Sequence, residues 1–290
     1  MERGTWFMRI GIAGQGYVGT AVKEVFGKHY ETNTFDLNGK CNCTDIEDLV
    51  DKSDIIFVCV PTPMKKDGSC DTSIVESVVK NIDEIVNYFT NKDHKIVAIK
   101  STVPPGTTNR LNKKCKNVSV IFNPEFLTEA NFIDDFKNQN RIIIGGERPS
   151  TTKLRQVYSL VFPDVTIVKT GSKTAEMVKY MTNTFLATKV SFANEMKMIC
   201  DELNIDYDKV VEYSTYDERL GKSHWAVPGP DGKLGFGGSC FPKDVNALIS
   251  LSKDMRLYLH TLQGVWKTNL KVRPEEDWKE LKGRAVVDDK

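Results

Sequence analysis

The sequence predicts an α/β protein: a doubly wound parallel sheet, then a long connecting helix and a small helical domain. Three features support this fold class. Short apolar runs alternate with helical patterns through the first half, a glycine turn follows the first run, and an uninterrupted helical pattern extends from residue 172 to about residue 203. With 290 residues the chain has room for two domains. We place the first at residues 1–171 and the second at residues 172–290.

Seven apolar runs are expected to form the strands of the sheet. Because continuous apolar strands separated by helices are buried on both faces, they are typical of a parallel sheet. The expected strands are residues 9–13, 32–35, 54–60, 95–100, 118–122, 141–144 and 165–168. The helical patterns between them include residues 74–89, 107–114 and 151–161.

A glycine turn follows the first expected strand and leads into a helical pattern. Gly14, Gly16 and Gly19 have the spacing Gly-x-Gly-x-x-Gly. The first permits a tight turn, the second lets a pyrophosphate approach the backbone, and the third lets helix and strand pack closely. The helix N-terminus then offers N–H groups to the phosphates. This pattern predicts a Rossmann-like dinucleotide-binding domain, and the alternative is a glycine turn without a ligand.

Asp36 ends the second expected strand, about twenty residues after the turn. A carboxylate at this place accepts hydrogen bonds from ribose hydroxyls and repels a 2′-phosphate, so NAD is favoured over NADP. Lys40, just beyond, weakens this preference slightly.

Polar residues follow the carboxyl ends of three further expected strands. Ligands of doubly wound sheets bind beyond these ends. Thr62, Thr102, Glu125 and Glu129 are therefore candidates for the site. Ordinary loop and helix-cap chemistry is the alternative, because Thr and Glu are common where helices begin.

The helical pattern from residue 172 is unusually long. At 1.5 Å per residue it predicts a helix of roughly 45 Å, which suits a spine between two domains or a dimer interface. Lys179 and Asn183 are four residues apart and share a face of this helix. The alternative for Lys179 is a solvated lysine on an exposed surface.

Cys240 follows a glycine-rich segment, residues 235–238, and precedes an apolar helical pattern. Pro242 suits the first turn of a helix. We therefore expect Cys240 at or near a helix N-terminus, where the thiol pKa falls and the thiolate is favoured. Asp244 follows four residues later on the same helical face. A buried structural cysteine at a tight turn is the alternative.

Composition excludes several classes of protein. The net charge of +1 predicts no general attraction to nucleic acid or to anionic membranes. The chain has no apolar run near the roughly 18 residues of a membrane span, and its first seven residues lack the core of a signal peptide. Seven irregularly spaced cysteines favour a reducing, cytoplasmic location. Cys41 and Cys43 lack a second ligand pair, so we expect no metal site.

Eight short motifs follow one another along the chain. They are Gly-Tyr-Val-Gly at 16–19, Val-Pro-Thr-Pro at 60–63, Lys-Ser-Thr-Val-Pro at 100–104, Asn-Pro-Glu-Phe-Leu at 123–127, Ala-Glu-Met-Val-Lys at 175–179 with Asn183, Asn-Glu at 194–195, Asp-Glu-Arg-Leu-Gly at 217–221, and Gly-Phe-Gly-Gly-Ser-Cys-Phe-Pro-Lys-Asp at 235–244. Together they resemble the UDP-glucose/GDP-mannose dehydrogenase family, from residue 8 to about residue 285. Members of that family usually continue into a second α/β domain that closes over the nucleotide end of the substrate. We therefore expect a shortened form without that domain and without the arginine it supplies.

The resemblance implies an NAD-dependent, four-electron oxidation of UDP-glucose to UDP-glucuronate. The Cys240 thiolate would attack an intermediate aldehyde, and the thiohemiacetal would be oxidised to a thioester. Lys179 and Asn183 would stabilise the oxyanion, and the carboxylates and Thr102 would act on the water that releases the acid. The expected catalytic residues are Cys240, Lys179, Asn183, Asp244, Glu125 and Thr102.

The resemblance also implies binding residues and a partner. Glu129 would lie near the nicotinamide, and Arg219 would reach the pyrophosphate in a neighbouring subunit's site, so a homodimer or higher homo-oligomer is expected. The expected cofactor-binding residues are Gly11, Gly14, Gly16, Tyr17, Val18, Asp36, Lys40, Thr62, Thr102, Glu129 and Lys243. The expected substrate-binding residues are Glu125, Phe126, Leu127, Glu129, Lys179, Asn183, Arg219, Gly235, Phe236, Gly237 and Gly238.

Two alternatives stay open at this point. A dehydrogenase of another sugar nucleotide, such as GDP-mannose or UDP-N-acetylmannosamine, would carry similar motifs. A non-catalytic, NAD-binding protein would keep the fold without turnover, although the complete set of chemical residues argues against it.

Overall fold

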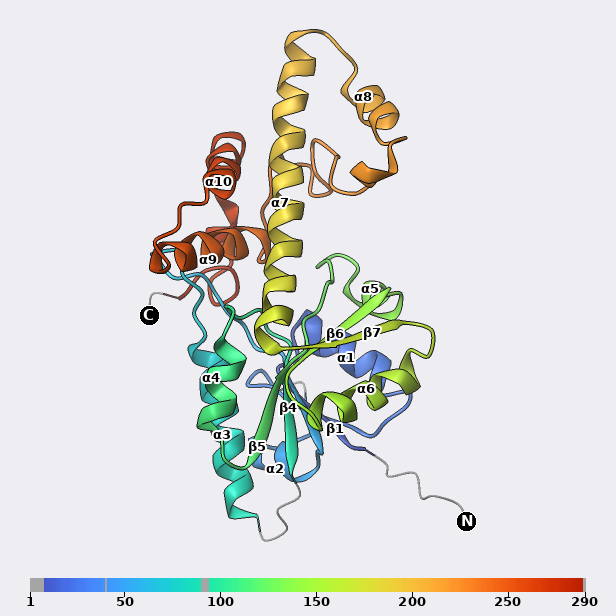
Figure 1. Ribbon diagram of the computed structural model, residues 1–290, viewed down its shortest axis with the longest axis vertical. Helices are drawn as coiled ribbons and strands as arrows, with labels where there is room; N and C mark the ends of the chain where they lie inside the picture. Colours follow the sequence, from blue (N-terminus) through green and yellow to red (C-terminus); the bar gives the residue numbers. More distant parts are fainter. Residues whose placement is uncertain (1–7, 40, 90–93, 289–290) are drawn as a thin grey trace. The chain divides into compact units, whose positions relative to one another are not determined.

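The structure is a computed structural model that describes residues 8–39, 41–89 and 94–288 (Figure 1). The described chain divides into two compact units. The first unit takes its residues from Met1–Thr62 and Thr72–Lys179, and the second from Pro63–Asp71 and Tyr180–Lys290. The long helix α7 (Ser172–Glu202) contains the third and last boundary between them, after Lys179.

A seven-stranded sheet forms the middle of the first unit, as far as the structure describes it. The strand order is β2-β1-β3-β4-β5-β6-β7. The chain therefore leaves the first strand in one direction and later returns past it in the other, which is the doubly wound arrangement that the sequence predicts. The strands are β1 (Ile10–Ala13), β2 (Thr32–Phe35), β3 (Ile55–Val58), β4 (Lys95–Ile99), β5 (Val118–Phe122), β6 (Arg141–Gly145) and β7 (Thr166–Thr170).

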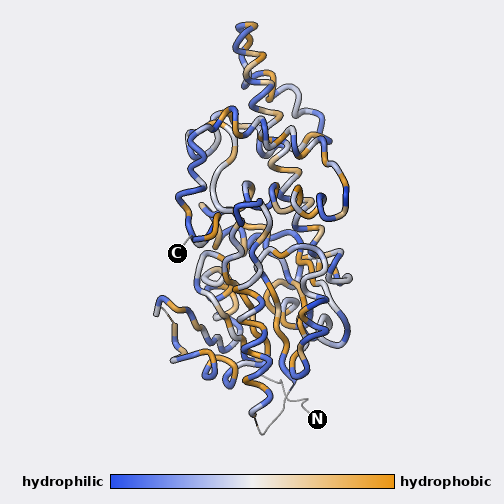
Figure 2. The backbone as a smooth tube through the Cα atoms, turned by 90° about the vertical axis from the view of Figure 1, so that its left-hand side faces the viewer, coloured by the Kyte–Doolittle hydropathy of each residue, from blue (hydrophilic) through white to orange (hydrophobic). Residues whose placement is uncertain are grey.

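Both faces of this sheet are buried. Along β3, Ile56 and Val58 join one apolar cluster, whereas Ile55 and Phe57 join the other. Successive side chains of a strand point to opposite faces, so a strand covered on both sides must be apolar throughout. Figure 2 shows such hydrophobic stretches, in orange, along the backbone of the sheet region. The interpretation of the continuous apolar runs is confirmed for β1 and for β3 to β6, but it is wrong for the edge strand β7, where Val168 is 42% exposed.

One pairing differs from the expected parallel sheet. β5 and β6 pair antiparallel, through Phe122 and Gly145, while the other neighbours in the sheet are parallel. The Asn123 side chain supplements this short ladder, because its Nδ2 donates to the carbonyl oxygen of Ile143 at 2.8 Å. A side chain thus connects two strands where the backbone pairing is minimal, and no periodic pattern in the sequence signals that.

The helices of the first unit follow the expected patterns with two additions. The expected patterns correspond to α1 (Tyr17–Phe26), α3 (Ser73–Tyr88), α4 (Thr107–Lys114) and α6 (Ser150–Val161). The additions are α2 (Ile46–Asp51) and α5 (Phe132–Lys137), six residues each, which are too short for a clear helical period. No helix within the described ranges is both long and apolar enough to cross a membrane.

The second unit is helical. Beyond α7 it contains α8 (Tyr207–Ser214), α9 (Phe241–Asp254), α10 (His260–Val272) and the short 3₁₀ turns η1 (Glu218–Leu220) and η2 (Asp277–Glu280). A small core contains Ala187 of α7, Phe236 of the loop before α9, Val245 and Ile249 of α9, and Val265 of α10. The last long helix begins at His260.

The polar composition of residues 273–290 predicts a loosely held tail, but this prediction is wrong, because residues 273–288 are well packed. The Trp278 side chain is fully buried and packs against Trp266, with ring centroids 5.3 Å apart and the ring planes tilted by 55°. The backbone of Met64 bonds to Ala285 and Val287, at 2.9 and 3.0 Å. These partners lie more than two hundred positions apart in sequence, so local composition could not reveal them.

Replacing Trp278 tests whether this segment stabilises the second unit. We expect Trp278→Ala to lower the free energy of unfolding by about 3–5 kcal/mol, as for other buried aromatic truncations. Trp278→Phe should cost less, because the buried indole N–H has no hydrogen-bond partner within the described residues. Urea titration of both variants measures the difference, and equal stability of Trp278→Ala and the wild type would contradict a packed tail.

Candidate functional site

The glycine turn between β1 and α1 has the geometry of a dinucleotide site. Gly14 has φ +97°, and a Cβ there would lie 2.5 Å from the carbonyl oxygen of Cys59. A Cβ on Gly19 would lie 1.9 Å from the carbonyl oxygen of Gly14, so these two glycines are required by packing. Gly16 is different, because no atom lies within 4 Å of the position of its Cβ. The turn is therefore open at the glycine where a pyrophosphate would approach.

The first turn of α1 is also suited to an anion. Gly16 caps the helix and contributes no side-chain hydrogen bond to its N–H groups. Asp36, at the end of β2, accepts hydrogen bonds from the backbone N–H of Gln15 at 2.6 Å and of Asn38 at 2.8 Å. Its carboxylate thus lies beside the turn, where ribose hydroxyls are expected, and the residues present fit NAD. Lys40 lies outside the described residues.

The predicted residues at the strand ends differ in exposure. Thr62 and Thr102 are buried, and Glu125 and Glu129 are half-buried. All four belong to the first unit. The prediction that the carboxyl ends of several strands carry polar side chains is confirmed, while contact with a ligand stays a prediction for each of them.

Glu125 and Lys179 form a buried ion pair. The Lys179 Nζ lies 2.9 Å from Glu125 Oε1 and 2.6 Å from the Glu125 carbonyl oxygen. The exposed fractions of the two side chains are 3% for Lys179 and 10% for Glu125. Burial raises the pKa of the Glu125 carboxyl, but the Lys179 ammonium, the Leu127 backbone N–H and the Lys100 ammonium together outweigh this, and the net pKa is lowered. Glu125 is therefore an ionised carboxylate, and the alternative of a solvated Lys179 is wrong.

The turn that carries Glu125 rests on a buried polar group that the sequence analysis assigned no role. The ammonium of Lys100 donates to the Asn123 carbonyl oxygen at 3.2 Å and to Asn123 Oδ1 at 3.1 Å. The Tyr158 hydroxyl donates to the same Oδ1 at 2.6 Å. Burial lowers the pKa of Lys100 to about 8. Lys100 and Asn123 both lie in family motifs, but only the tertiary contacts show that they support the end of β5.

A second cluster lies at the start of α9. Cys240 is the N-cap of this helix and Pro242 lies in its first turn, as predicted. Asp244 is 1% exposed and accepts hydrogen bonds from Lys243 Nζ at 2.5 Å and from Asn183 Nδ2 at 2.6 Å. Burial opposes the charge of Lys243, but Asp244 and the thiols of Cys240 and Cys70 raise its pKa above the ordinary value. Lys243, predicted to contact the cofactor, here neutralises Asp244.

Other predicted residues lie outside these clusters. Arg219, in η1, pairs with Asp217, and its side chain is 89% exposed. It is therefore open to contact from outside the chain. Phe126 lies under two cations, with its ring 5.4 Å from Lys179 Nζ and 4.2 Å from the Arg141 guanidinium carbon.

The described ranges contain no group of three or more His, Cys, Asp or Glu side chains that could hold a metal ion. They also contain no disulfide, although all seven cysteines are described.

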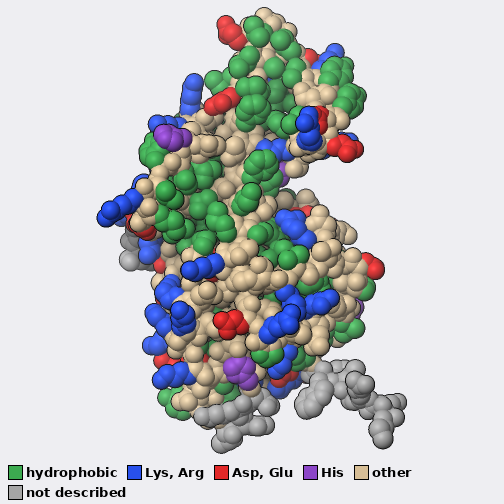
Figure 3. All heavy atoms as spheres, in the orientation of Figure 1, with side chains coloured by type: hydrophobic (Ala, Val, Ile, Leu, Met, Phe, Trp, Pro, Cys, Tyr) green, Lys and Arg blue, Asp and Glu red, His purple; other side chains and the backbone are tan. Residues whose placement is uncertain are grey.

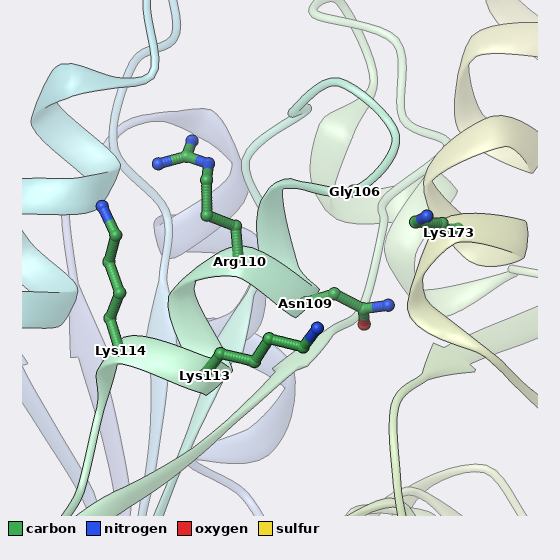
Figure 4. A pocket seen from close by; sticks show the side chains of 6 residues that line it. All are labelled: Gly106, Asn109, Arg110, Lys113, Lys114 and Lys173. Carbon is green, nitrogen blue, oxygen red and sulfur yellow. The ribbon is translucent and has the colours of Figure 1, made fainter.

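A basic pocket of about 440 Å³ lies elsewhere in the first unit (Figure 4). Figure 4 shows Arg110 and Lys114 pointing to one side of α4, with Asn109 and Lys113 on the other. Arg110 forms a bidentate pair with Glu76, at 2.7 and 2.9 Å. Lys113 and Lys114 lie in the last turn of α4, where the helix dipole favours cations. Helix electrostatics thus accounts for much of this lining, which includes none of the predicted site residues.

Two family models match most of the chain. The NAD binding domain of the UDP-glucose/GDP-mannose dehydrogenase family matches residues 31–162, and its central domain matches residues 173–271. The chain belongs to the UDP-glucose/GDP-mannose dehydrogenase family. This confirms the family predicted from the motifs, and NAD as the cofactor of the first domain.

Individual members of the family agree with this assignment. UDP-glucose 6-dehydrogenase TuaD of Bacillus subtilis is 35% identical over 236 residues, which are 79% of this chain and 49% of that protein. Among solved structures, a UDP-glucose dehydrogenase from Pyrobaculum islandicum is 30% identical, with a TM-score of 0.84 over 93% of this chain and 70% of that one. A GDP-mannose dehydrogenase from Pseudomonas aeruginosa is 28% identical, with a TM-score of 0.67 over 95% and 71%. The chain spans about half the length of the curated relatives it matches.

The buried Lys100 predicts a specific pH dependence of stability. Its folded pKa of about 8 lies below the ordinary value of 10.5, so between these pH values the unfolded chain binds more protons than the folded one. The free energy of unfolding of the wild type should therefore rise through this window, by up to about 3 kcal/mol relative to Lys100→Met. Urea titrations of both proteins at pH 7.5 to 10.5 measure the difference, and a constant difference would contradict a depressed pKa.

Proposed function

We propose that this chain carries the catalytic residues for the NAD-dependent, four-electron oxidation of UDP-glucose to UDP-glucuronate. The observation that carries the proposal is Cys240 at the N-cap of α9, four residues before a buried Asp244 that is bonded to Lys243 and Asn183. A half-buried cysteine at a helix N-terminus beside an ammonium has the surroundings of a reactive thiolate. The UDP-glucose/GDP-mannose dehydrogenase family, to which the chain belongs, indicates a sugar nucleotide as the substrate.

NAD⁺, when bound, accepts a hydride in each of two oxidation steps. The first step converts the C6 alcohol of the sugar to an aldehyde. The Cys240 thiolate then attacks the aldehyde carbon, which forms a carbon–sulfur bond and an oxyanion. Loss of the second hydride leaves a thioester, and attack by water breaks the carbon–sulfur bond. The carboxylate product and the thiol of Cys240 are released, so the enzyme returns to its starting state.

Donors on α7 are suited to stabilise the oxyanion. Asn183 uses one of its two amide N–H groups on Asp244, which leaves the other for the substrate. Two of the three N–H donors of Lys179 are bonded to Glu125. Because Lys179 and Asn183 are one turn apart on the same helix, about 6 Å along its axis, we assign both to one substrate carbon.

We assign the activation of the water that attacks the thioester to the carboxylates. Glu125 is ionised and can accept a proton from a water molecule, with the Thr102 hydroxyl as a second partner for that water. Asp244, held by Asn183 and Lys243, is the alternative acceptor near the sulfur. Glu129 is assigned to the nicotinamide side, and Phe126, Leu127 and the glycine loop at residues 235–238 to the sugar nucleotide.

The stoichiometry of NADH tests the proposed activity directly. With NAD⁺ and UDP-glucose, the purified protein should form two NADH for each UDP-glucuronate. Cys240→Ser should lower turnover by at least about a thousandfold, because an alcohol is a far weaker nucleophile than a thiolate. Cys115→Ser, which changes a cysteine outside both clusters, serves as the control and should keep full activity.

Parallel assays with GDP-mannose and UDP-N-acetylmannosamine decide the substrate. If NADH forms with only one of these two sugar nucleotides, that sugar nucleotide replaces UDP-glucose in the proposal. No NADH with any of the three, despite measurable NAD⁺ binding, would indicate a protein that binds NAD without turnover and would overturn the proposed activity.

We also propose that the protein acts as a homodimer through α7. Met181, Phe185, Phe192, Ile199 and Leu203 follow one another at intervals of four, seven, seven and four residues and are between 47 and 67% exposed. This spacing places the first four on one face of α7, and Leu203 directly follows the end of the helix. In Figure 3 hydrophobic side chains, in green, gather over α7. A second copy of the same stripe is its matching partner, and the exposed Arg219 would then be available to a neighbouring site.

Charge substitution in this stripe tests the dimer. Phe185→Glu combined with Phe192→Glu should convert a dimer to a monomer in size-exclusion chromatography with light scattering, because like charges would then face each other across an apolar interface. Leu257→Glu changes an equally exposed apolar residue outside the stripe and should leave the dimer intact. A wild type that is monomeric at tens of micromolar would contradict the proposal.

A further inference from the structure

Three buried side chains hold the loop that leads to Cys240. Asn194 of α7 accepts a hydrogen bond from the backbone N–H of Gly235 at 3.2 Å. Asn269 of α10 bonds to Phe236, and Arg273, at the end of α10, bonds to the carbonyl oxygen of Leu234 at 3.3 Å. Irregular backbone that is removed from water needs such partners. The glycine-rich loop is recognisable in the sequence, but none of the eight motifs includes Asn269 or Arg273.

Asn269 satisfies both backbone groups of one loop residue. Its Oδ1 accepts from the Phe236 N–H at 2.7 Å, and its Nδ2 donates to the Phe236 carbonyl oxygen at 3.0 Å. The Asn269 side chain is fully buried, and Phe236 is 4% exposed. An amide this deep is costly unless it is bonded, so Asn269 and Phe236 hold each other in a single arrangement.

Arg273 fixes the loop from a second direction. It is 2% exposed, and its Nη2 lies 2.7 Å from both Asp231 and Asp277, which neutralise its charge. The guanidinium lies directly against Gly237, since a Cβ on that residue would be 2.4 Å from Nη2 and 2.6 Å from Cζ. Gly237 is therefore required by Arg273 itself.

Gly235 and Gly238 show two further roles for glycine in the same loop. A Cβ on Gly235, which has φ +65°, would lie 2.4 Å from Asn269 Oδ1. Gly238 has φ +70°, but no atom lies within 4 Å of the position of its Cβ. Gly235 and Gly237 thus face the supporting side chains, whereas Gly238 has free space at the position of its Cβ.

The loop and α9 share a core, which connects this support to the cysteine. Phe236 packs with Val245 and Ile249 of α9 and with Val265 of α10. Its ring also contacts Phe241, the first residue of α9, with centroids 6.0 Å apart. A shift of Phe236 would therefore move the first turn of α9, where Cys240 is the N-cap.

We infer that Asn269 and Arg273 are positioning residues: they set the place of Cys240 at the N-terminus of α9 without touching the substrate. The inference rests on the proposed role of Cys240. It predicts that both residues govern the reactivity of the thiol, beyond any effect on stability.

The reactivity of Cys240 toward iodoacetamide tests this inference without turnover. In Asn269→Leu, peptide mass spectrometry should show Cys240 alkylation at neutral pH slowed at least tenfold, with the midpoint of its pH profile moved upward, because the sulfur leaves the helix N-terminus. kcat should fall by a similar factor while the KM for NAD⁺ stays unchanged. Ser191→Ala is the matched control, since Ser191 makes a buried bond to the Val265 carbonyl oxygen at 3.0 Å and none to the loop. It should lower Tm only.

A lower Tm for Asn269→Leu with unchanged alkylation rate and pH profile would overturn the inference and leave Asn269 a purely structural residue. Absence of NADH formation would overturn the proposed activity instead, and the alkylation experiment would still report on positioning. The two failures are therefore distinguishable.

A double-mutant cycle covers the case in which Asn269→Leu does not fold. Gly237→Ala should slow Cys240 alkylation because its methyl group meets the Arg273 guanidinium. Adding Arg273→Ser removes that clash, so the double variant should react at the rate of Arg273→Ser alone. Strictly additive effects of the two changes would show that Arg273 does not act on the loop and would overturn its assignment.

Discussion

Buried asparagine side chains that bond to loop backbone underlie both candidate clusters. Asn123 ties the end of β5 to β6 through the Ile143 carbonyl and receives bonds from Lys100 and Tyr158. Asn269 holds both backbone groups of Phe236. An unsatisfied buried polar group costs about 1–3 kcal/mol, so these loops have few alternatives once the surrounding core has formed. The positions of the candidate site residues next to these loops therefore depend on the asparagine hydrogen bonds.

Charge is balanced locally around each cluster. Lys179 pairs with Glu125, Lys243 with Asp244, and Arg273 with two aspartates. Pairing keeps these buried groups ionised, because an isolated buried charge would change its protonation instead. Lys100 is the exception, since oxygens and aromatic rings surround it in place of a carboxylate, and its pKa falls to about 8. A family motif thus contains one lysine whose charge depends on pH close to neutrality.

Helix α7 contributes to both units through residues only one turn apart. Lys179 belongs to the Glu125 pair of the first unit, and Asn183 to the Asp244 group of the second. A continuous helix fixes the spacing of such residues along its axis.

The sequence by itself determined the features that depend on local patterns. Apolar runs predicted a sheet buried on both faces, the Gly14 turn predicted the strand-to-helix connection, and Pro242 predicted the start of α9 at Cys240. Each follows from periodicity or from the steric limits of glycine and proline, which act within a few residues. The ordered motifs added the family.

Tertiary structure decided which groups are paired and which are buried. Nothing near Lys179 in the sequence indicates that it would form an ion pair with Glu125, 54 positions away. The same holds for Asn269 and Phe236, 33 positions apart, and for the C-terminal segment, whose Trp278 is fully buried. The antiparallel junction of β5 and β6 likewise includes a side-chain bond from Asn123 to Ile143, 20 positions away. Hydrogen bonds and ion pairs of this kind need only proximity in space, so no local period or spacing in the chain records them.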